Sequence, residues 1–379
     1  MTLQVLTKGQ RQDRRDLREL ITLATEGLPQ MFDAQKQLFC DRMLHTEQGP
    51  VRKGTSRRYT FITLLGLHQV RVAGLPLPFE IQPVIDALLQ DTARLDNLGD
   101  LGLLIWLCAL ASPDRLSDFC SRHALDSAVD RYPDGRERRT MALSWFLSGL
   151  SHVAIARPAR RGDLTGIAEA VYSILKKNQG PHGIFGHQAQ SAGLTGILRG
   201  HLGSFADQVY PIYALALSLQ AFQFEDALAP ASACADAICR AQGPLGQWWW
   251  HYDSNIGKVV GKYPIYSVHQ HGMAPMALFA LGEAAKRDFD REIYQGLEWI
   301  YGKNELQSDM RDASARMIWR CIRPAKFMRY LSEAVSLLKP DRDERPPGGM
   351  KILHECWPYE FGWLLYAFAK HVRTWPAAG

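Results

Sequence analysis

The sequence predicts an all-α protein, an (α/α)6 toroid of about six helical hairpins that forms a single domain over residues 1–379. Apolar residues recur at helical spacing in one segment after another, and no run alternates with a period of two. The tripeptide Gln-Gly-Pro occurs at 48–50, 179–181 and 242–244, so its copies start 131 and 63 residues apart, one interval about twice the other. A chain of 379 residues holds about six units of that length, which is enough to close a ring.

The predicted helices follow one another along the chain, with turns and longer loops between them. Each Gln-Gly-Pro is expected to mark a helix end, because proline does not continue a helix, and two of the helices that end there span 167–178 and 230–241. Tyr-Pro-Ile-Tyr at 210–213 and 263–266 is expected to open helices at 211–224 and 264–285, since proline suits a first turn. The remaining predicted helices span 58–72, 98–111, 140–154, 289–301, 323–338 and 357–372. Residues 340–349, rich in charge, proline and glycine, predict a surface loop.

Composition excludes several classes of protein. With 46% hydrophobic and 22% charged residues the chain is an ordinary globular protein, and its longest near-apolar run, Leu101 to Ala111, is too short to span a bilayer. A net charge of +5 permits acidic ligands but falls short of a nucleic-acid footprint. The N-terminal residues lack an apolar core of secretory type, and the seven cysteines are odd in number and scattered. We therefore expect a cytoplasmic location and no transmembrane segment.

Two of the tripeptides extend to Gln179-x-x-x-Gly183-x-Phe185 and Gln242-x-x-x-Gly246-x-Trp248. This pattern resembles the core of the Gln-Trp repeat in the terpenoid-cyclase and protein-prenyltransferase superfamily of α/α toroids. In that superfamily the glutamine bonds to backbone and the aromatic ring stacks over it, so the resemblance implies the fold. By architecture alone the chain is also similar to the six-hairpin sugar enzymes, which include hydrolases, uronate-processing enzymes and sugar 2-epimerases.

The chain departs from the first of these groups at the residues that carry its chemistry. The Asp-x-Asp-Asp acid of class II cyclases is missing, and the nearest cluster, Asp96-Asn-Leu-Gly-Asp100, has a different spacing. His269-Gln-His271 and His354-Glu-Cys356 lack the flanking pattern of the prenyltransferase zinc site. The departures favour a sugar as the substrate.

Titratable and aromatic residues gather where the inner helices of such a ring would begin, and these ends crowd the mouth of its cavity. Tyrosine, histidine and carboxylate groups in proximity transfer protons to and from a sugar. We expect His269, Tyr266 and Tyr213 to act as acid or base, with Asp253 and Glu355 as orienting or acid groups. The expected substrate-binding residues are Asp207, Tyr210, Trp249, His251, Tyr263, Gln270, His271, Trp357, Tyr359 and Glu360.

Two local questions stay open in the sequence. His269 and His271 lie in a loop if the helix begins near Pro275, and on a kinked helix if it begins at Pro264. Zinc is the alternative to packed histidines, but four ligands at familiar spacing are not visible, and no cofactor is predicted. Trp248 is expected to pack within the motif, and either Trp249 or Trp250 is expected to face the cavity.

The sequence therefore predicts a carbohydrate-active enzyme of hydrolase, lyase or epimerase type. Its expected substrate is an acidic oligosaccharide or glycoconjugate, either a small saccharide or a lipid-linked precursor, as in polysaccharide biosynthesis. One alternative is a terpenoid cyclase or prenyltransferase that acts on an isoprenoid. The other is a toroid that binds a partner without catalysis.

Overall fold

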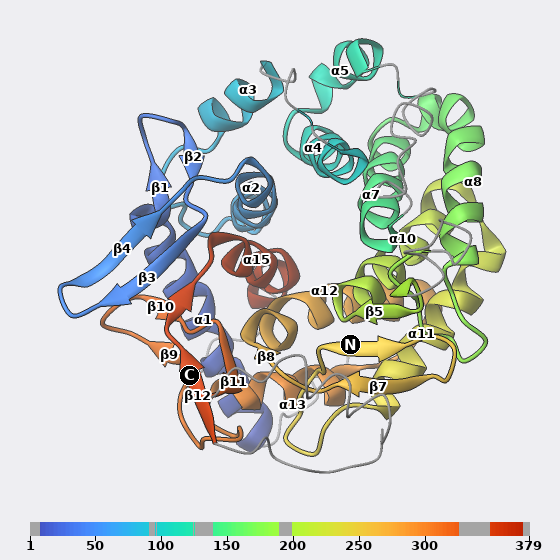
Figure 1. The fold of residues 1–379 in the computed structure, drawn as a ribbon. Helices are drawn as coiled ribbons and strands as arrows, with labels where there is room; N and C mark the ends of the chain where they lie inside the picture. The colour runs from blue at the N-terminus through green and yellow to red at the C-terminus, as the bar shows by residue number, and fades with distance from the viewer. Residues whose placement is uncertain are drawn as a thin grey trace.

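The computed structural model describes residues 8–90, 95, 97–123, 125, 139–188, 199–325 and 349–373. Its helices form two concentric rings (Figure 1). Six of the described helices make the inner ring: each contacts the next, and the last packs along the first, so the ring closes. These are α2 (Arg57–Val72), α4 (Leu98–Ala111), α7 (Thr140–Ala156), α10 (Ala206–Phe222), α12 (Ala274–Ala285) and α15 (Pro358–Arg373). The predicted α/α toroid is confirmed.

The outer helices alternate with the inner ones along the chain and pack against their outer faces. α1 packs on α15, α3 and α5 on α4, α8 on α7, and α11 on α10, while α13 packs beside α12. The outer helices are α1 (Lys8–Met31), α3 (Gln82–Gln90), α5 (Leu116–His123), α8 (Arg161–Lys177), α11 (Leu228–Arg240) and α13 (Asp290–Ile300). None of the described helices is long and apolar enough to cross a membrane.

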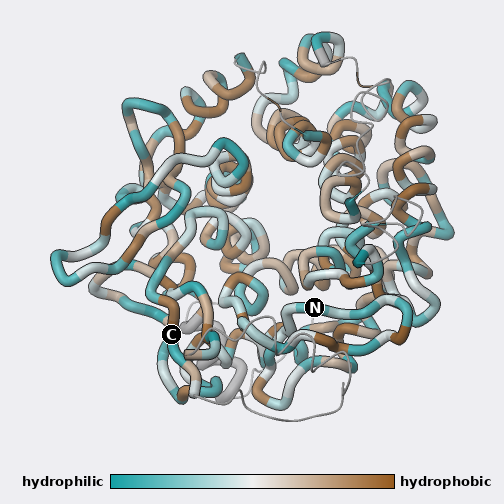
Figure 2. The backbone as a smooth tube through the Cα atoms, viewed as in Figure 1, coloured by the Kyte–Doolittle hydropathy of each residue, from teal (hydrophilic) through white to brown (hydrophobic). Residues whose placement is uncertain are grey.

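Hydropathy decides which ring a helix joins. In α4, 11 of 14 residues are buried, as expected for a helix that is apolar on all sides and packed on all sides (Figure 2). In α8, of 17 residues, the buried ones are Leu164, Ala168, Val171, Tyr172 and Leu175, which form a single stripe that faces inward. The inner ring therefore holds the densest part of the hydrophobic core.

The two later Gln-Gly-Pro segments occupy equivalent places. Gln179 Nε2 donates to the carbonyls of Gly183 and Pro230, and Gln242 Nε2 donates to those of Gly246 and Glu292. Each glutamine thus ties the turn after one outer helix to the start of the next. The segment at 48–50 is different: it lies in the β3–β4 hairpin, so the prediction that it ends a helix is wrong.

Two predicted helix starts are also wrong. α10 begins at Ala206, five residues before Pro211, which lies inside the helix. Pro264 precedes a strand, β8 (Ile265–Tyr266), because this segment pairs with β11 (Cys321–Pro324). A π-helical turn over His269–Met273 follows, and Pro275 occupies the first turn of α12. The histidines therefore precede the α-helix.

Short antiparallel strands border the ends at which the inner helices begin, although no run of the sequence alternates with a period of two. They form three-stranded sheets of β13-β3-β4, β5-β6-β7 and β12-β11-β8, and the pairs β1-β2 and β9-β10. Strands of two to five residues are too short to show a period of two. Their bounds are β1 (Phe32–Asp33), β2 (Leu38–Phe39), β3 (Arg42–Thr46), β4 (Gly49–Lys53), β5 (Leu202–Ser204), β6 (His251–Asp253), β7 (Lys258–Gly261), β9 (Arg311–Asp312), β10 (Met317–Ile318), β12 (Met350–Leu353) and β13 (Glu355–Cys356).

The predicted helix at 323–338 is wrong at its start, because Arg323 and Pro324 belong to β11. Residues 326–338 lie outside the described residues. The predicted loop at 340–349 also lies outside them, except for Gly349.

Aromatic side chains fill the centre of the ring at mid-height of the inner helices. The Trp106 ring stacks on those of His152 and Tyr213, each at 5.0 Å, and meets Tyr366 edge-on at 5.2 Å. The hydroxyls of Tyr213 and Tyr366 are 2.6 Å apart. This aromatic plug closes the centre of the ring at mid-height. An open site therefore lies between the plug and the ends where the inner helices begin.

Candidate active site

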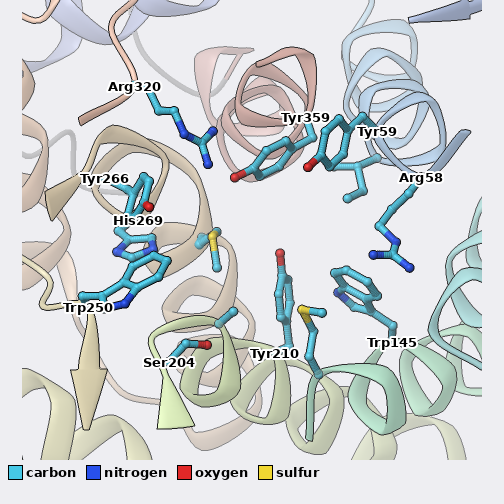
Figure 3. A pocket seen from close by; sticks show the side chains of 14 residues that line it. Arg58, Tyr59, Trp145, Ser204, Tyr210, Trp250, Tyr266, His269, Arg320 and Tyr359 are labelled. Carbon is cyan, nitrogen blue, oxygen red and sulfur yellow. The ribbon is translucent and has the colours of Figure 1, made fainter. Parts of the chain in front are cut away.

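A cavity of about 200 Å³ lies where the inner helices begin (Figure 3). Residues from the first two turns of α2, α7, α10 and α15, from the π-helical turn, and from the short strands or the residues next to them line it. The partial positive charge of a helix N-terminus favours an anionic ligand there. The lining residues are Arg58, Tyr59, Ile62, Met141, Trp145, Ser204, Ala206, Tyr210, Trp250, Tyr266, His269, Met273, Arg320 and Tyr359.

Six aromatic rings form the walls in three contacting pairs. The ring centroids are 5.0 Å apart in the pair Trp145–Tyr210, 4.5 Å in Trp250–Tyr266 and 4.7 Å in Tyr59–Tyr359. Paired rings hold each other in place, and an aromatic side chain presents an apolar face with a polar tip. The walls thus offer flat surfaces for a sugar ring together with hydroxyl groups for its oxygens.

Arg58 lines one side of the cavity and is held by a carboxylate. Its Nε and Nη2 donate to the two carboxylate oxygens of Asp100, at 2.5 and 3.0 Å, and its guanidinium lies 5.7 Å from the Trp145 ring. Asn97, the N-cap of α4, donates to the same carboxylate and accepts from the Asp100 backbone N–H. The start of α4 thereby fixes the orientation of this arginine.

Arg320 lies across the cavity and is held in the same manner (Figure 3). Its Nη1 donates to Glu360 Oε1 at 2.6 Å, and the guanidinium lies 3.5 Å from the Trp357 ring and 4.9 Å from that of Tyr266. Burial raises the pKa of Glu360 to about 7, against the opposing effect of Arg320. The arginine is therefore a buried cation with one carboxylate partner behind it.

His269 and Tyr266 lie side by side in the wall, with ring centroids 5.3 Å apart. Burial disfavours the charged form of His269 and lowers its pKa to about 3, so its imidazole is neutral at pH 7. Burial raises the pKa of Tyr59 to about 12 and that of Tyr210 further, so both phenols keep their protons. The cavity therefore combines a neutral base with protonated hydroxyl donors.

Four of the residues selected from sequence line the cavity: Tyr210, Tyr266, His269 and Tyr359. Trp357 and Glu360 lie directly behind it, in contact with Arg320. Asp207 is buried below the wall, where it accepts hydrogen bonds from the backbone N–H and hydroxyl of Ser204 and lies 3.2 Å from His187 Nδ1. That contact raises the pKa of His187.

The other proposed catalytic residues lie away from the cavity. Tyr213 belongs to the aromatic plug, with its hydroxyl 3.0 Å from His152 Nε2. Asp253 lies in the β6–β7 hairpin, where its carboxylate accepts from the Asn255 backbone N–H and sits 3.7 Å from His201. Glu355 accepts a hydrogen bond from Trp357 Nε1 at 3.0 Å.

The remaining residues selected from sequence have packing contacts. Gln270 donates to the Tyr266 carbonyl and accepts from the Trp248 N–H, and the side chain of His271 is fully buried. Trp249 points away from the cavity: its Nε1 donates to the Ala241 carbonyl, and Tyr263 meets its ring edge-on. His251 packs on Trp250. Of the two tryptophans left open by the sequence, Trp250 is the one that faces the cavity.

Sequence reasoning missed Arg58, Tyr59, Trp145 and Arg320 at the cavity. Three of these lie in the first two turns of helices that the sequence did predict, at 58–72 and 140–154, so the rule that inner helices begin at the cavity would have found them. Arg320 precedes a short strand that the sequence did not reveal. In the part of the chain that the structure describes, no three His, Cys, Asp or Glu side chains are placed to hold a metal ion.

No family model matches the chain, and no curated protein matches it either. Solved structures do. A glycosyl hydrolase family 88 protein from Bacteroides vulgatus has a TM-score of 0.59 at 12% identity, over 95% of this chain and 99% of that one. A possible GH105 family member from Salmonella enterica serovar Paratyphi A has a TM-score of 0.59 at 11% identity, over 99% and 96%.

An unsaturated glucuronyl hydrolase specific for heparin has a TM-score of 0.58 at 12% identity, over 95% of this chain and 96% of that one. At such identities the likeness concerns the fold, and it confirms the resemblance to six-hairpin sugar enzymes at that level. All three neighbours are sugar enzymes by name, so they give no support to the resemblance to terpenoid cyclases.

Proposed function

We propose that this chain is a carbohydrate-active enzyme that binds an acidic saccharide in the cavity at the starts of its inner helices. The observation that carries the proposal is the combination, in one cavity, of paired aromatic rings with two guanidinium groups. Aromatic faces suit sugar rings, and guanidinium groups suit carboxylates. The names of the structural neighbours support it, since one is a hydrolase of unsaturated glucuronyl groups specific for heparin.

The chemistry we propose is proton transfer by His269 and Tyr266. A guanidinium bound to a uronate carboxylate withdraws charge from it, which makes the adjacent C5–H more acidic. The base we propose is His269, whose imidazole is neutral at pH 7 and whose ring lines the cavity; it takes that proton, and a tyrosine hydroxyl returns a proton to C5 in an epimerase or donates one to the leaving oxygen in a lyase. Tyr266 lies 4.9 Å from the Arg320 guanidinium and 5.3 Å from the His269 ring, so this base and this donor share one side of the cavity, which suits elimination by a lyase. An epimerase would return the proton from the opposite face, where Tyr59, Tyr210 and Tyr359 line other walls.

The cavity lining favours these two reactions over hydrolysis by a pair of carboxylates. The cavity lining contains no Asp or Glu, and Asp100 and Glu360 are each bound to a lining arginine. A glycosidase of the usual kind needs two carboxyl groups that flank the scissile bond. Proton abstraction needs only a base, a donor and a cation at the carboxylate.

The experiment that tests the proposal incubates the protein with uronate oligosaccharides in heavy water. Deuterium at C5 would identify an epimerase, an unsaturated product a lyase, and a new reducing end without unsaturation a hydrolase. We expect Tyr266→Phe and His269→Gln to lower the rate by about 10²-fold or more, the usual size of a general acid–base contribution. Tyr263→Phe is the matched control, because Tyr263 packs on Trp249 away from the cavity.

A second candidate, an enzyme acting on a prenyl diphosphate, draws support from a different part of the lining. Ile62, Met141 and Met273 add apolar surface to the aromatic walls, and the arginines suit a diphosphate. Thermal-shift measurements with farnesyl diphosphate and with digalacturonate distinguish the two. Stabilisation by the diphosphate alone would replace the sugar proposal, and saccharide binding without turnover would favour the non-catalytic toroid.

The proposed setting is the cytoplasm. None of the seven cysteines forms a disulfide, and six of them are buried. Such usage is typical of a reducing compartment. Fractionation of cells that make the protein checks this point.

A further inference from the structure

Resting on the proposed function, we infer that the substrate carries two anionic groups, one bound by Arg320 and the other by Arg58. The shared chemistry is a pair of oxyanions on one saccharide, whether two carboxylates or a carboxylate and a sulfate. Each arginine lines the cavity, and Figure 3 shows them on opposite sides of it.

Arg320 is built into the wall as a fixed anion site. Its side chain is only 12% exposed, and aromatic rings flank the guanidinium at 3.5 Å and 4.9 Å, which leaves it little freedom. Glu360 takes up a single N–H of the five that a guanidinium offers. A planar guanidinium oriented in this way presents its remaining N–H groups without a further cost in side-chain entropy.

Glu360 and Trp357 act as positioning residues for Arg320. The carboxylate holds the guanidinium from behind, and Trp357 is itself anchored through the 3.0 Å hydrogen bond to Glu355. Glu355 and Trp357 come from the segment that leads into α15, and Glu360 comes from the first turn of that helix. In its ionised form Glu360 balances the charge of Arg320, which lowers the cost of burying the guanidinium.

Arg58 repeats this arrangement on the other side. Asp100 accepts hydrogen bonds from two of its N–H groups, and Asn97 donates a hydrogen bond to Asp100. Asn97 therefore supports Arg58 from behind, as Trp357 supports Arg320. Asp100 and Glu360 both belong to the first turn of an inner helix, so each arginine has a carboxylate brace that comes from the ring itself. The cavity thus has two separate guanidinium sites, with aromatic rings between them.

A saccharide with one acidic group would use one of these sites and leave the other facing sugar hydroxyls. A saccharide with two acidic groups would use both, and its ring would lie between them along Trp145, Tyr210 and Trp250. Hydrogen bonds to a charged group contribute about 1.5–3 kcal/mol each, or roughly 10- to 100-fold in affinity. The second anion should therefore tighten binding by at least about tenfold.

The test measures dissociation constants by calorimetry for the full chain with cellobiose, cellobiouronate, digalacturonate and a sulfated chondroitin disaccharide. These probes carry no acid, one carboxylate, two carboxylates, and a carboxylate with a sulfate. We expect the two dianions to bind at least tenfold more tightly than cellobiouronate, and cellobiose most weakly. A difference between the two dianions identifies which oxyanion the second site prefers.

The variants Arg58→Gln and Arg320→Gln are each expected to abolish the preference for dianions. Arg58→Lys and Arg320→Lys keep the charge and serve if the glutamine variants unfold; each is expected to retain only part of the preference, since lysine lacks the planar fork. Arg287→Gln, which removes a surface ion pair with Asp236, is the control and should change nothing.

Equal binding of cellobiouronate and the dianions by the unaltered protein would overturn the two-anion inference and leave the proposed function standing. So would a dianion preference that survives in both glutamine variants. If no acidic saccharide binds at all, the proposed function itself fails, and the inference fails with it.

Discussion

At the scale of single residues, the structure separates side chains that face the cavity from neighbours that only pack. Trp248, Trp249 and Trp250 show this, since the first is fully buried, the second bonds to the Ala241 carbonyl and the third lines the cavity. The sequence predicted that the three would differ, and that Trp248 would pack. It could not decide between the other two, because that choice depends on the β6–β7 hairpin, whose strands are too short to be seen in the sequence.

Three buried histidines predict how stability depends on pH. Burial lowers the pKa of His152, His269 and His271 to about 3, below the ordinary value of 6.5. Between pH 6.5 and pH 3 the unfolded chain therefore binds more protons at these histidines than the folded protein does. The free energy of unfolding is unaffected by them above about pH 6.5 and decreases as pH falls towards 3. A shift of this size corresponds to on the order of 5 kcal/mol for one group.

His271→Gln is expected to flatten the fall in unfolding free energy between pH 6.5 and pH 4. Urea unfolding at several pH values measures it. His182→Gln is the matched control, because His182 is exposed and should leave the slope unchanged. The pH dependence that Glu360 adds has the opposite sign. Because its pKa is raised to about 7, the folded protein holds a proton there that the unfolded chain has already released, so its contribution to the free energy of unfolding falls as pH rises towards 7. Parallel slopes for wild type and His271→Gln would refute the assignment.

At the scale of elements, helices were easier to predict than the segments that connect them. The segments at 98–111 and 140–154 match α4 and α7 closely, because buried helices carry long apolar runs. The strands and the π-helical turn at His269–Met273 left no sequence pattern, since short strand pairs and one extra residue per turn depend on tertiary contacts. Those segments and the residues that adjoin them supply Ser204, Trp250, Tyr266, His269 and Arg320. The sequence selected Tyr266 and His269, left Trp250 open against Trp249, and missed Ser204 and Arg320.

The hydrogen bonds from Gln179 and Gln242 to backbone carbonyls give a prediction at this scale. Gln179→Ala removes two hydrogen bonds that join the turn after α8 to Pro230 at the start of α11. We expect a loss of about 1–3 kcal/mol in the free energy of unfolding, from two partly buried carbonyls left without that donor. Chemical denaturation measures the change.

Gln48→Ala is the control for the brace, because Gln48 has the same tripeptide context but lies exposed in the β3–β4 hairpin. It should change stability by less than about 0.5 kcal/mol. A similar loss in both variants would show that the Gln179 contacts carry no special weight.

At the scale of the whole molecule, the fold was predictable because the 63-residue interval between the two later Gln-Gly-Pro copies matches the length of one hairpin. The sequence could not show where the first inner helix meets the last. Gly66 of α2 and Gly362 of α15 make that contact: a Cβ on Gly66 would lie 2.2 Å from the Gly362 carbonyl oxygen. The ring therefore closes through two glycines that let the helix backbones touch.

Gly66→Ala is expected to destabilise the protein by about 1–3 kcal/mol or more, because the clash is with backbone and neither helix can move away within a closed ring. Gly166→Ala is the matched control. Gly166 lies exposed in α8 with nothing near its missing Cβ, so alanine there should add about 0.5–1 kcal/mol. Calorimetric melting of both variants decides the matter, and an unchanged Gly66→Ala would mean that the ring does not close through this contact.

The most direct measurement is a crystal structure of the protein with digalacturonate bound. The account predicts the saccharide in the cavity at the starts of the inner helices, its rings along Trp250 and Trp145 and a carboxylate at each of Arg320 and Arg58. An empty cavity at saturating ligand would contradict it, as would a saccharide seated elsewhere, such as the outer groove between α11 and the β6–β7 hairpin that Arg240 and Lys258 line.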